Sequence, residues 1–500
     1  MRPFTPAVLV LSLLSMARAE GDLRFRLQRR WPDPRGILEN YYAGDGWDFY
    51  SRFRYSSAAW GFTFLTDKAR GEDWGDILGG GAAWVPAAGP VSSVSCGFLR
   101  ANMGTGLVIS VPGGFSDVSE LSMYKPPNSR NRIQPATSPR GCRADPLTGA
   151  GVIMSAGGLD ISILAALSPI DSLAGGYHRT PSEVQARGAI TEKLAAVRLA
   201  RRGVGITGMA ASRDRGGGYS WMRLGTDWSG DFGEWNSSGE VTVGSDSSGS
   251  AVAGWTALSR RADYFRHMVT ILRNPEGFPV ERSSAPISRQ CDIGLVTGFR
   301  WRIFPGTVVK AGAGAYFREL DDLLLASTEF EHRFPWSMTG SLGLRTRTEP
   351  HRLAWRGWLG SVWQPHDLLS IRTKVQLTGW NDSQLDSTES GSGLELKLRY
   401  SRGRVFRLDI GGAACSTDGY NSRVYAGGSS FPGVFSSTAI YGRTILLFSQ
   451  LSVSVTDELW LRGAVSRRTV DGASCLGSGW EETQGDSRTD FGFQLDYAFQ

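Results

Sequence analysis

The stretch Leu369-Ser370-Ile371-Arg372-Thr373-Lys374-Val375-Gln376-Leu377-Thr378-Gly379 decides the fold of this chain. Mostly apolar side chains hold the odd-numbered positions up to Leu377, and polar side chains, among them Arg372 and Lys374, hold the positions between. Successive side chains of a β-strand point to opposite faces, so this pattern predicts a strand with one apolar face and one wet face. The two basic residues lie on the wet face.

The same alternation recurs along the chain. Residues 394–400 and 406–410 alternate on either side of a turn at 401–404, and further pairs are traced at 193–207, 336–347 and 353–363. A soluble sandwich also alternates, but its strands are commonly about 5 or 6 residues long. Many segments here run to about 9 to 12 residues, the length with which a tilted strand crosses a bilayer.

Membrane insertion by helices is not expected in the mature chain. No segment after residue 19 is continuously apolar for the roughly 18 residues that a transmembrane helix requires, although 41% of the chain is hydrophobic. The 64 glycines and 17 tryptophans fit tight turns and membrane interfaces of a barrel. We therefore predict an all-β fold, a large transmembrane antiparallel β-barrel of roughly 20 strands.

The ends of the sequence complete this domain prediction. Residues 1–19 have the basic, apolar and small-residue regions of a cleaved signal peptide. Residues 20–47 are predicted as a short N-terminal periplasmic segment and 48–500 as the barrel. Residues 491–499 alternate aromatic or apolar with other side chains, like the closing strand of a bacterial outer-membrane barrel, although Gln500 follows the last aromatic residue. The expected location is the outer membrane of a Gram-negative cell, with membrane lipids and the barrel-assembly machinery as partners.

One long segment breaks the strand pattern. Residues 112–146 contain several prolines, which cannot continue a strand ladder, among the basic residues Lys125, Arg130, Arg132, Arg140 and Arg143. The segment is predicted as a long proline-rich loop, either a basic plug, lid or surface-binding loop or an ordinary solvated loop. Shorter breaks at 213–220, 229–239, 244–250, 382–393 and 466–487 are rich in Gly, Ser and Asp and predict further loops.

The sequence indicates no enzyme, no cofactor and no metal site. The five histidines lack metal-ligand spacing, and no Gly-x-Ser-x-Gly elbow occurs. Residues 203–208 match a dinucleotide fingerprint formally, but no helix pattern follows them, so they are interpreted as a strand beside a turn. The odd number of cysteines, five, leaves at least one unpaired, and a Cys415–Cys475 disulfide stays open.

The charge of the chain is mild. Formal net charge is +6, and it becomes +4 when Arg2 and Arg18 leave with the signal peptide. Basic residues are spread over alternating strands, where they line a lumen rather than form a nucleic-acid patch. This pattern has two interpretations: a preference for small or extended anionic solutes, or simple solvation of the inner face.

Four stretches resemble a family of large uncharacterised barrel proteins of Bacteroidetes-type bacteria, often described as helix-hairpin-helix domain proteins. The resemblance rests on Gly175-Gly176-Tyr177-His178-Arg179-Thr180-Pro181-Ser182-Glu183, Asn102-Met103-Gly104-Thr105-Gly106-Leu107-Val108, Arg140-Gly141-Cys142-Arg143-Ala144 and Asp48-Phe49-Tyr50-Ser51-Arg52-Phe53-Arg54-Tyr55. The family tends to show Gly-Gln-Gly-Leu where this chain has Thr105 in the second position. The last stretch is similar to the family's first barrel strand.

The resemblance covers roughly residues 48–208 and implies a barrel without an established activity. Relatives usually carry a helix-hairpin-helix region before the barrel, which would imply DNA contact; here residues 20–46 precede the first expected strand and show no such signature. Two functions remain open from the sequence. The first is a pore or transporter for solutes, and the second is a non-conducting surface-binding or assembly barrel, with DNA uptake as a family-level possibility.

Overall fold

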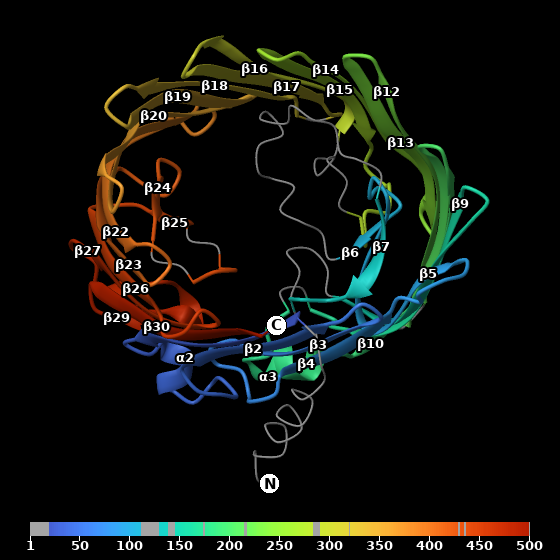
Figure 1. Ribbon diagram of the computed structural model, residues 1–500. Helices are drawn as coiled ribbons and strands as arrows, with labels where there is room; N and C mark the ends of the chain where they lie inside the picture. Colours follow the sequence, from blue (N-terminus) through green and yellow to red (C-terminus); the bar gives the residue numbers. More distant parts are fainter. Residues whose placement is uncertain are drawn as a thin grey trace.

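The computed structural model describes residues 20–111, 130–138, 146–173, 176–214, 218–283, 291–319, 321–428, 431–434 and 437–499. The chain forms a closed antiparallel barrel of 24 strands, which confirms the predicted all-β barrel and lies above the predicted strand number (Figure 1). The expected signal peptide, residues 1–19, falls outside the described residues.

The wall strands follow one another around the ring in chain order. They are β1 (Glu20–Trp31), β2 (Trp47–Ser56), β3 (Trp60–Lys68), β4 (Ile77–Trp84), β5 (Val91–Gly104), β8 (Leu147–Ala156), β9 (Leu159–Ile170), β10 (Ile190–Arg201), β11 (Val204–Asp214), β12 (Tyr219–Phe232), β13 (Trp235–Asp246), β14 (Gly249–Arg261), β15 (Phe265–Asn274), β16 (Cys291–Phe304), β17 (Thr307–Phe317), β18 (Leu323–Phe334), β19 (Met338–Glu349), β20 (Arg352–His366), β21 (Leu369–Asp382), β22 (Ser387–Arg402), β23 (Phe406–Thr417), β26 (Thr444–Ser454), β27 (Leu459–Val470) and β30 (Ser487–Phe499).

Shorter elements lie between the wall strands. They are β6 (Ile109–Val111), β7 (Arg130–Pro135), β24 (Val424–Gly427), β25 (Ser437–Ile440), β28 (Cys475–Leu476), β29 (Thr483–Gln484), the helices α2 (Arg35–Leu38) and α3 (Pro181–Ala186), and the 3₁₀ turn η2 (Gly479–Glu481). No helix among the described residues is both long and apolar enough to cross a membrane.

The barrel closes between β1 and β30, which pair from Gly21↔Phe499 to Trp31↔Thr489. The prediction that residues 20–47 precede the barrel is therefore wrong, and the stretch from Asp48, expected as the first strand, belongs to the second. A closed barrel leaves no unpaired edge, so β30 requires a partner, and the alternation Leu23-Arg24-Phe25-Arg26-Leu27 supplies one. The arginines in that alternation face the lumen rather than the periplasm.

The two faces of the wall differ as the alternation predicts. On β21, Val375 and Leu377 point outward with 42% and 51% of their surface exposed, while Gln376 and Thr378 point inward and are buried. Exposed aromatic side chains gather around one end of the barrel, at the short turns. This aromatic ring comprises Trp60, Trp84, Phe232, Trp235, Tyr264, Trp301, Phe304, Trp336 and Trp363.

The two ends of the barrel differ in loop length. The end that carries the aromatic ring has short connections, such as 157–158 and 202–203, whereas the other end has longer ones, such as 32–46 and 171–189. Three predicted loops, 229–239, 244–250 and 382–393, are mostly strand, because long hairpins carry Gly, Ser and Asp beyond their apolar middle. Residues 203–208 form a turn and the start of β11, as interpreted.

Candidate functional site: the barrel lumen

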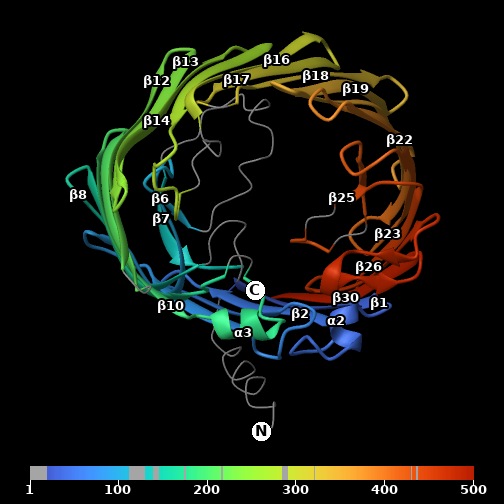
Figure 2. The same ribbon diagram turned by 180° about the vertical axis from the view of Figure 1, so that it is seen from behind.

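The lumen holds a small sheet that is continuous with the wall. After Leu99, β5 leaves its wall neighbours and pairs with β6 on one edge, at Ala101↔Val111, and with β7 on the other, from Leu99↔Pro135 to Gly104↔Arg130. Figures 1 and 2 show β6 and β7 inside the ring of wall strands. We call residues 99–104 of β5 with β6 and β7 the plug sheet.

The plug sheet is amphipathic. Its apolar side chains are buried against the inner face of β8 to β12. This cluster contains Leu99, Ala101, Met103, Val108, Ile109, Val111, Ile133, Leu147, Leu164, Ala166, Leu194, Ala196, Met209, Ala211 and Trp221. Arg100 and Asn102 alternate with the buried residues and are less buried, and Arg132, opposite Asn102, is exposed. The plug sheet thus places basic side chains on the face turned away from the wall.

The turn between β5 and β6 is held on the wall by one carboxylate. Glu240 of β13 is buried and accepts hydrogen bonds from the backbone N–H groups of Thr105, Leu107 and Val108 at 3.2, 3.0 and 3.0 Å. The Thr105 hydroxyl donates to the same carboxylate. We call this set of contacts the plug latch, and it joins residues that are more than 130 positions apart in the sequence.

Further buried charges support the plug latch from the wall. Arg223 of β12 donates from Nη1 to the Val108 carbonyl at 2.9 Å. Arg198 and Asp227 form a buried ion pair directly under Gly104, where an added Cβ would lie 2.9 Å from Asp227 Oδ1. Gly104 has φ +73°, so a side chain there would meet both backbone strain and this ion pair. Close packing therefore explains why the 102–108 motif has a glycine at position 104.

A second feature folds into the lumen opposite the plug sheet. The hairpin β24–β25 follows β23 and buries Val424, Ala426 and Ile440 against the inner face of β23 and β26 (Figure 1). Gln376 donates to the Tyr425 carbonyl at 2.7 Å, and Gly427 N–H donates to Glu395 at 3.1 Å. The hairpin is thereby fixed to the polar face of β21 and β22.

Two luminal cavities lie beside these inward-folded parts. The hairpin cavity, about 320 Å³, lies between β24–β25 and the wall and is lined by Arg372, Lys374, Glu395 and Tyr425 among others. The seam cavity, about 290 Å³, lies at the closing strands and is lined by Arg24, Arg26, Tyr50, Arg52, Asp67, Thr137, Ser138 and Gly433.

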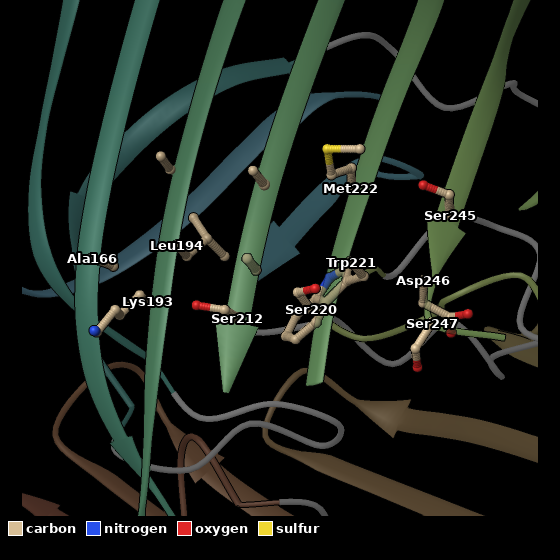
Figure 3. Close-up of a pocket in the computed structure, with 13 residues that line it drawn as sticks. Ala166, Lys193, Leu194, Ser212, Ser220, Trp221, Met222, Ser245, Asp246 and Ser247 are labelled. Atoms are coloured by element: carbon tan, nitrogen blue, oxygen red, sulfur yellow. The ribbon is translucent and has the colours of Figure 1, made fainter. Parts of the chain in front are cut away.

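A larger groove of about 590 Å³ lies on the other side of the wall, across β10 to β13 (Figure 3). Outward-facing Lys193, Ala195, Ala210, Ser212 and Ser220 line it, together with buried residues that alternate with them, such as Leu194 and Ala211. Small outward side chains leave this depression in the outer surface. It therefore faces away from the lumen.

At the end with longer loops, residues 32–46, 69–76, 171–189 and 471–486 meet in what we call the loop junction. His178 is buried there between two carboxylates, with Nδ1 2.8 Å from Asp76 and Nε2 2.9 Å from Asp171. Its backbone N–H donates to Glu72 at 3.0 Å. Arg179 pairs with Glu481 at 2.6 Å, and the Tyr42 hydroxyl donates to Glu481 at 3.0 Å, so the junction links four loops.

The loop junction contains the three residues best placed for a metal among those described. Glu72, Asp76 and His178 are all buried and bring one ligand atom each within 4.8 Å of one another. A histidine that binds a metal must have a neutral imidazole with one ring nitrogen free for the metal. Both nitrogens of His178 face carboxylates, so the residue fits an imidazolium that donates two hydrogen bonds. The geometry favours an ion-paired histidine over a metal ligand.

This arrangement predicts that the loop junction loosens at alkaline pH. Burial alone would lower the pKa of His178, but the hydrogen bonds to Asp171 and Asp76 outweigh it and raise the pKa to about 9. A pKa raised from an ordinary value near 6.5 contributes about 3 kcal/mol to the stability of the folded junction below pH 6.5. This contribution is lost as pH rises through 9. Hydrogen exchange of residues 176–180 should accelerate between pH 7 and 9.5 beyond the intrinsic rate. In His178→Gln this additional acceleration should be absent; its persistence would contradict the assignment.

The predicted site residues do not form one group. Arg372 and Lys374 line the hairpin cavity. Arg132 lies exposed on the plug sheet and Arg130 begins β7, so part of the predicted loop 112–146 is strand. Lys125, Arg140 and Arg143 lie outside the described residues. Proline was expected to interrupt the strand ladder throughout this segment. Residues 130–135 nevertheless form β7, and Pro135 is its last residue.

Sequence reasoning missed Arg24, Arg26 and Arg52 as luminal groups, and it missed Glu240 and the loop junction. The alternation of residues 22–28 and the capping box from Thr180 to Glu183, both readable in the sequence, could have indicated β1 and α3. Cys415 and Cys475 are both free thiols, so the disulfide left open from the sequence does not form.

Comparisons with known proteins found solved structures at low identity and low TM-score. No family model and no curated protein matches the chain. An anion-selective porin from Comamonas acidovorans is 12% identical, covering 61% of this chain and 93% of its own, with a TM-score of 0.34. The siderophore receptor PirA from Pseudomonas aeruginosa is 9% identical, covering 97% and 81%, with a TM-score of 0.44. The P pilus usher translocation pore is 9% identical, covering 96% and 99%, with a TM-score of 0.40. At these identities and TM-scores the likenesses carry no argument about this chain.

Proposed function

We propose that the chain spans the outer membrane of a Gram-negative bacterium and conducts solutes through its lumen. The observation that carries the proposal is the division of the wall into an apolar outer face and a polar inner face, with an aromatic ring at one end. Outer-membrane barrels have this division, with aromatic girdles at the membrane interfaces and polar interiors. Lipids contact the outer face, and barrel-assembly machinery inserts the chain.

The loop lengths support one orientation. Short turns of such barrels lie in the periplasm and longer loops lie outside the cell. The end with the aromatic ring would then be periplasmic, and the loop junction would face the exterior. In this orientation the plug sheet extends from β5 into the lumen and narrows the path between the cell exterior and the periplasm.

We assign no catalytic role to the lumen. In the described part of the chain, ionic, aromatic and hydroxyl-bearing side chains line both cavities, and neither lining contains a histidine or cysteine that could activate a nucleophile or act as one. Relation to the helix-hairpin-helix barrel family stays a proposal. The described α-helices are only four and six residues long, so DNA uptake receives no support from them.

Planar-bilayer recording of the refolded mature chain tests the proposal. We expect a steady conductance and, under a potassium chloride gradient, a reversal potential displaced towards that of chloride, because three arginines and one aspartate line the seam cavity. Heat-modifiable migration on a gel confirms that the same preparation is folded. A folded barrel that is silent in the bilayer would overturn conduction.

Silence would favour the alternative, a non-conducting barrel that binds a partner at the cell surface. The observation behind this alternative is the loop junction, which exposes Leu38, Trp74 and Tyr177 at the loop end. Exposed aromatic and apolar residues on ordered loops are typical of recognition surfaces.

A further inference from the structure

We propose that the seam cavity binds a small solute that carries phosphate or carboxylate groups. The inference deepens the proposed function, on which it rests, by naming the class of solute and the place where it is held. The cavity's volume of about 290 Å³ is at the lower end of the range for small-molecule sites.

The charge of the lining carries the inference. Three guanidinium groups, Arg24, Arg26 and Arg52, line the seam cavity together with one carboxylate, Asp67. Arg24 is paired with Asp496 of β30, and Arg52 donates from Nε to Asp22 at 3.1 Å. Each guanidinium carries five N–H donors, so these ion pairs leave donors on Arg24 and Arg52 for a further acceptor.

Arg26 is held differently from its two neighbours. Its guanidinium lies over the Tyr50 ring, with 4.9 Å from Cζ to the ring centroid. The negative charges of Asp67 and Asp48 attract the Arg26 guanidinium, and the positive charge of Arg24 repels it. A planar guanidinium stacked on an aromatic ring keeps its edge available for a bidentate contact with phosphate or carboxylate.

Both inward-folded parts of the lumen reach this cavity. The Tyr50 hydroxyl donates to the Thr137 carbonyl at 3.1 Å, just after the plug sheet, and Arg24 Nη1 donates to the Pro432 carbonyl at 2.9 Å, in the segment between β24 and β25. A solute bound here would sit where the wall, the plug side and the hairpin side converge. Contacts from several elements are typical of a specific site rather than of a solvated wall.

Calorimetric titration of inorganic phosphate into the full mature chain in detergent, at low ionic strength, tests the proposal, and succinate serves as the carboxylate probe. We expect saturable binding of at least one probe at one site per chain. Arg26→Gln should weaken it by about tenfold or more, because it removes a charge-assisted pair of hydrogen bonds. Arg26→Lys keeps the positive charge but loses the paired N–H donors of the guanidinium, so its affinity should lie between those of wild type and Arg26→Gln. Arg260→Gln is the control, since Arg260 lies on the outer face, paired with Glu234.

Each outcome decides the proposal. Saturable binding that Arg26→Gln weakens and Arg260→Gln leaves unchanged would support it, provided that both variants stay heat-modifiable. Absence of saturable binding for both probes, or equal binding by wild type and a folded Arg26→Gln, would overturn it. Conduction without saturable binding would refute only the site, whereas saturable binding by a protein that is silent in bilayers would refute only conduction.

Discussion

Replacing Glu240 by Ala is expected to free the plug sheet from the barrel wall and to raise the single-channel conductance. The substitution removes the acceptor of three backbone N–H groups in the turn 105–108. Each buried donor left without a partner costs about 1 to 3 kcal/mol, so docking of the turn should weaken by about 3 kcal/mol or more. Amide exchange of residues 105–109 should then accelerate by about a hundredfold.

Glu331→Ala provides the matched control. Glu331 also points into the lumen, from β18, but it pairs with Lys310 at 3.2 Å and contacts no part of the plug sheet in the described structure. It should leave both the conductance and the exchange of residues 105–109 unchanged. If Glu240→Ala left that exchange at the wild-type rate, the plug latch would not hold the turn.

A single charge on the outer face should destabilise the barrel more than the same charge one residue further along. Val465 lies near the middle of β27, points outward and is 44% exposed. In a lipid-facing position at the bilayer midplane, an arginine costs about 2 to 4 kcal/mol. Val465→Arg should therefore lower the free energy of unfolding by about that amount, measured by urea unfolding in lipid vesicles.

Ser466→Arg is the comparison for this substitution. Ser466 is the next residue of β27, points into the lumen and lies opposite Asp490 of β30. A guanidinium there can remain hydrated and face a carboxylate, so the change in unfolding free energy should stay within about 1 kcal/mol. Equal effects of the two substitutions would mean that β27 does not separate lipid from water.

The wall of the barrel was predictable because its information is local. The alternation of residues 369–379 is enough to assign β21 and its two faces, and it places Arg372 and Lys374 in the lumen without knowledge of any partner strand. The first strand was missed for a different reason. Its alternation is as clear, but its identity depends on pairing with residues 489–499 at the opposite end of the sequence.

The interior was less predictable because it is assembled from distant residues. The proline-rich segment suggested a plug, and its residues 130–135 form β7 of the plug sheet, but the sheet is built on β5 and its latch comes from Glu240. The motif around Gly104 was visible as a resemblance, while its packing against Asp227 was not. His178 likewise stood out in the sequence, but its partners Asp76 and Asp171 meet it only when two loops converge.

The most direct test of the account is a nitroxide scan along β27 in lipid vesicles, one label at a time from 461 to 469, in a chain whose five cysteines are replaced by serine. Accessibility to oxygen reports lipid, and accessibility to a water-soluble nickel chelate reports water. The account predicts alternation with a period of two, with oxygen favoured at 463, 465 and 467 and the chelate favoured at 462, 464, 466 and 468. Uniform access of the chelate to all positions would contradict the membrane-spanning barrel, and its exclusion from the even positions would contradict a water-filled lumen.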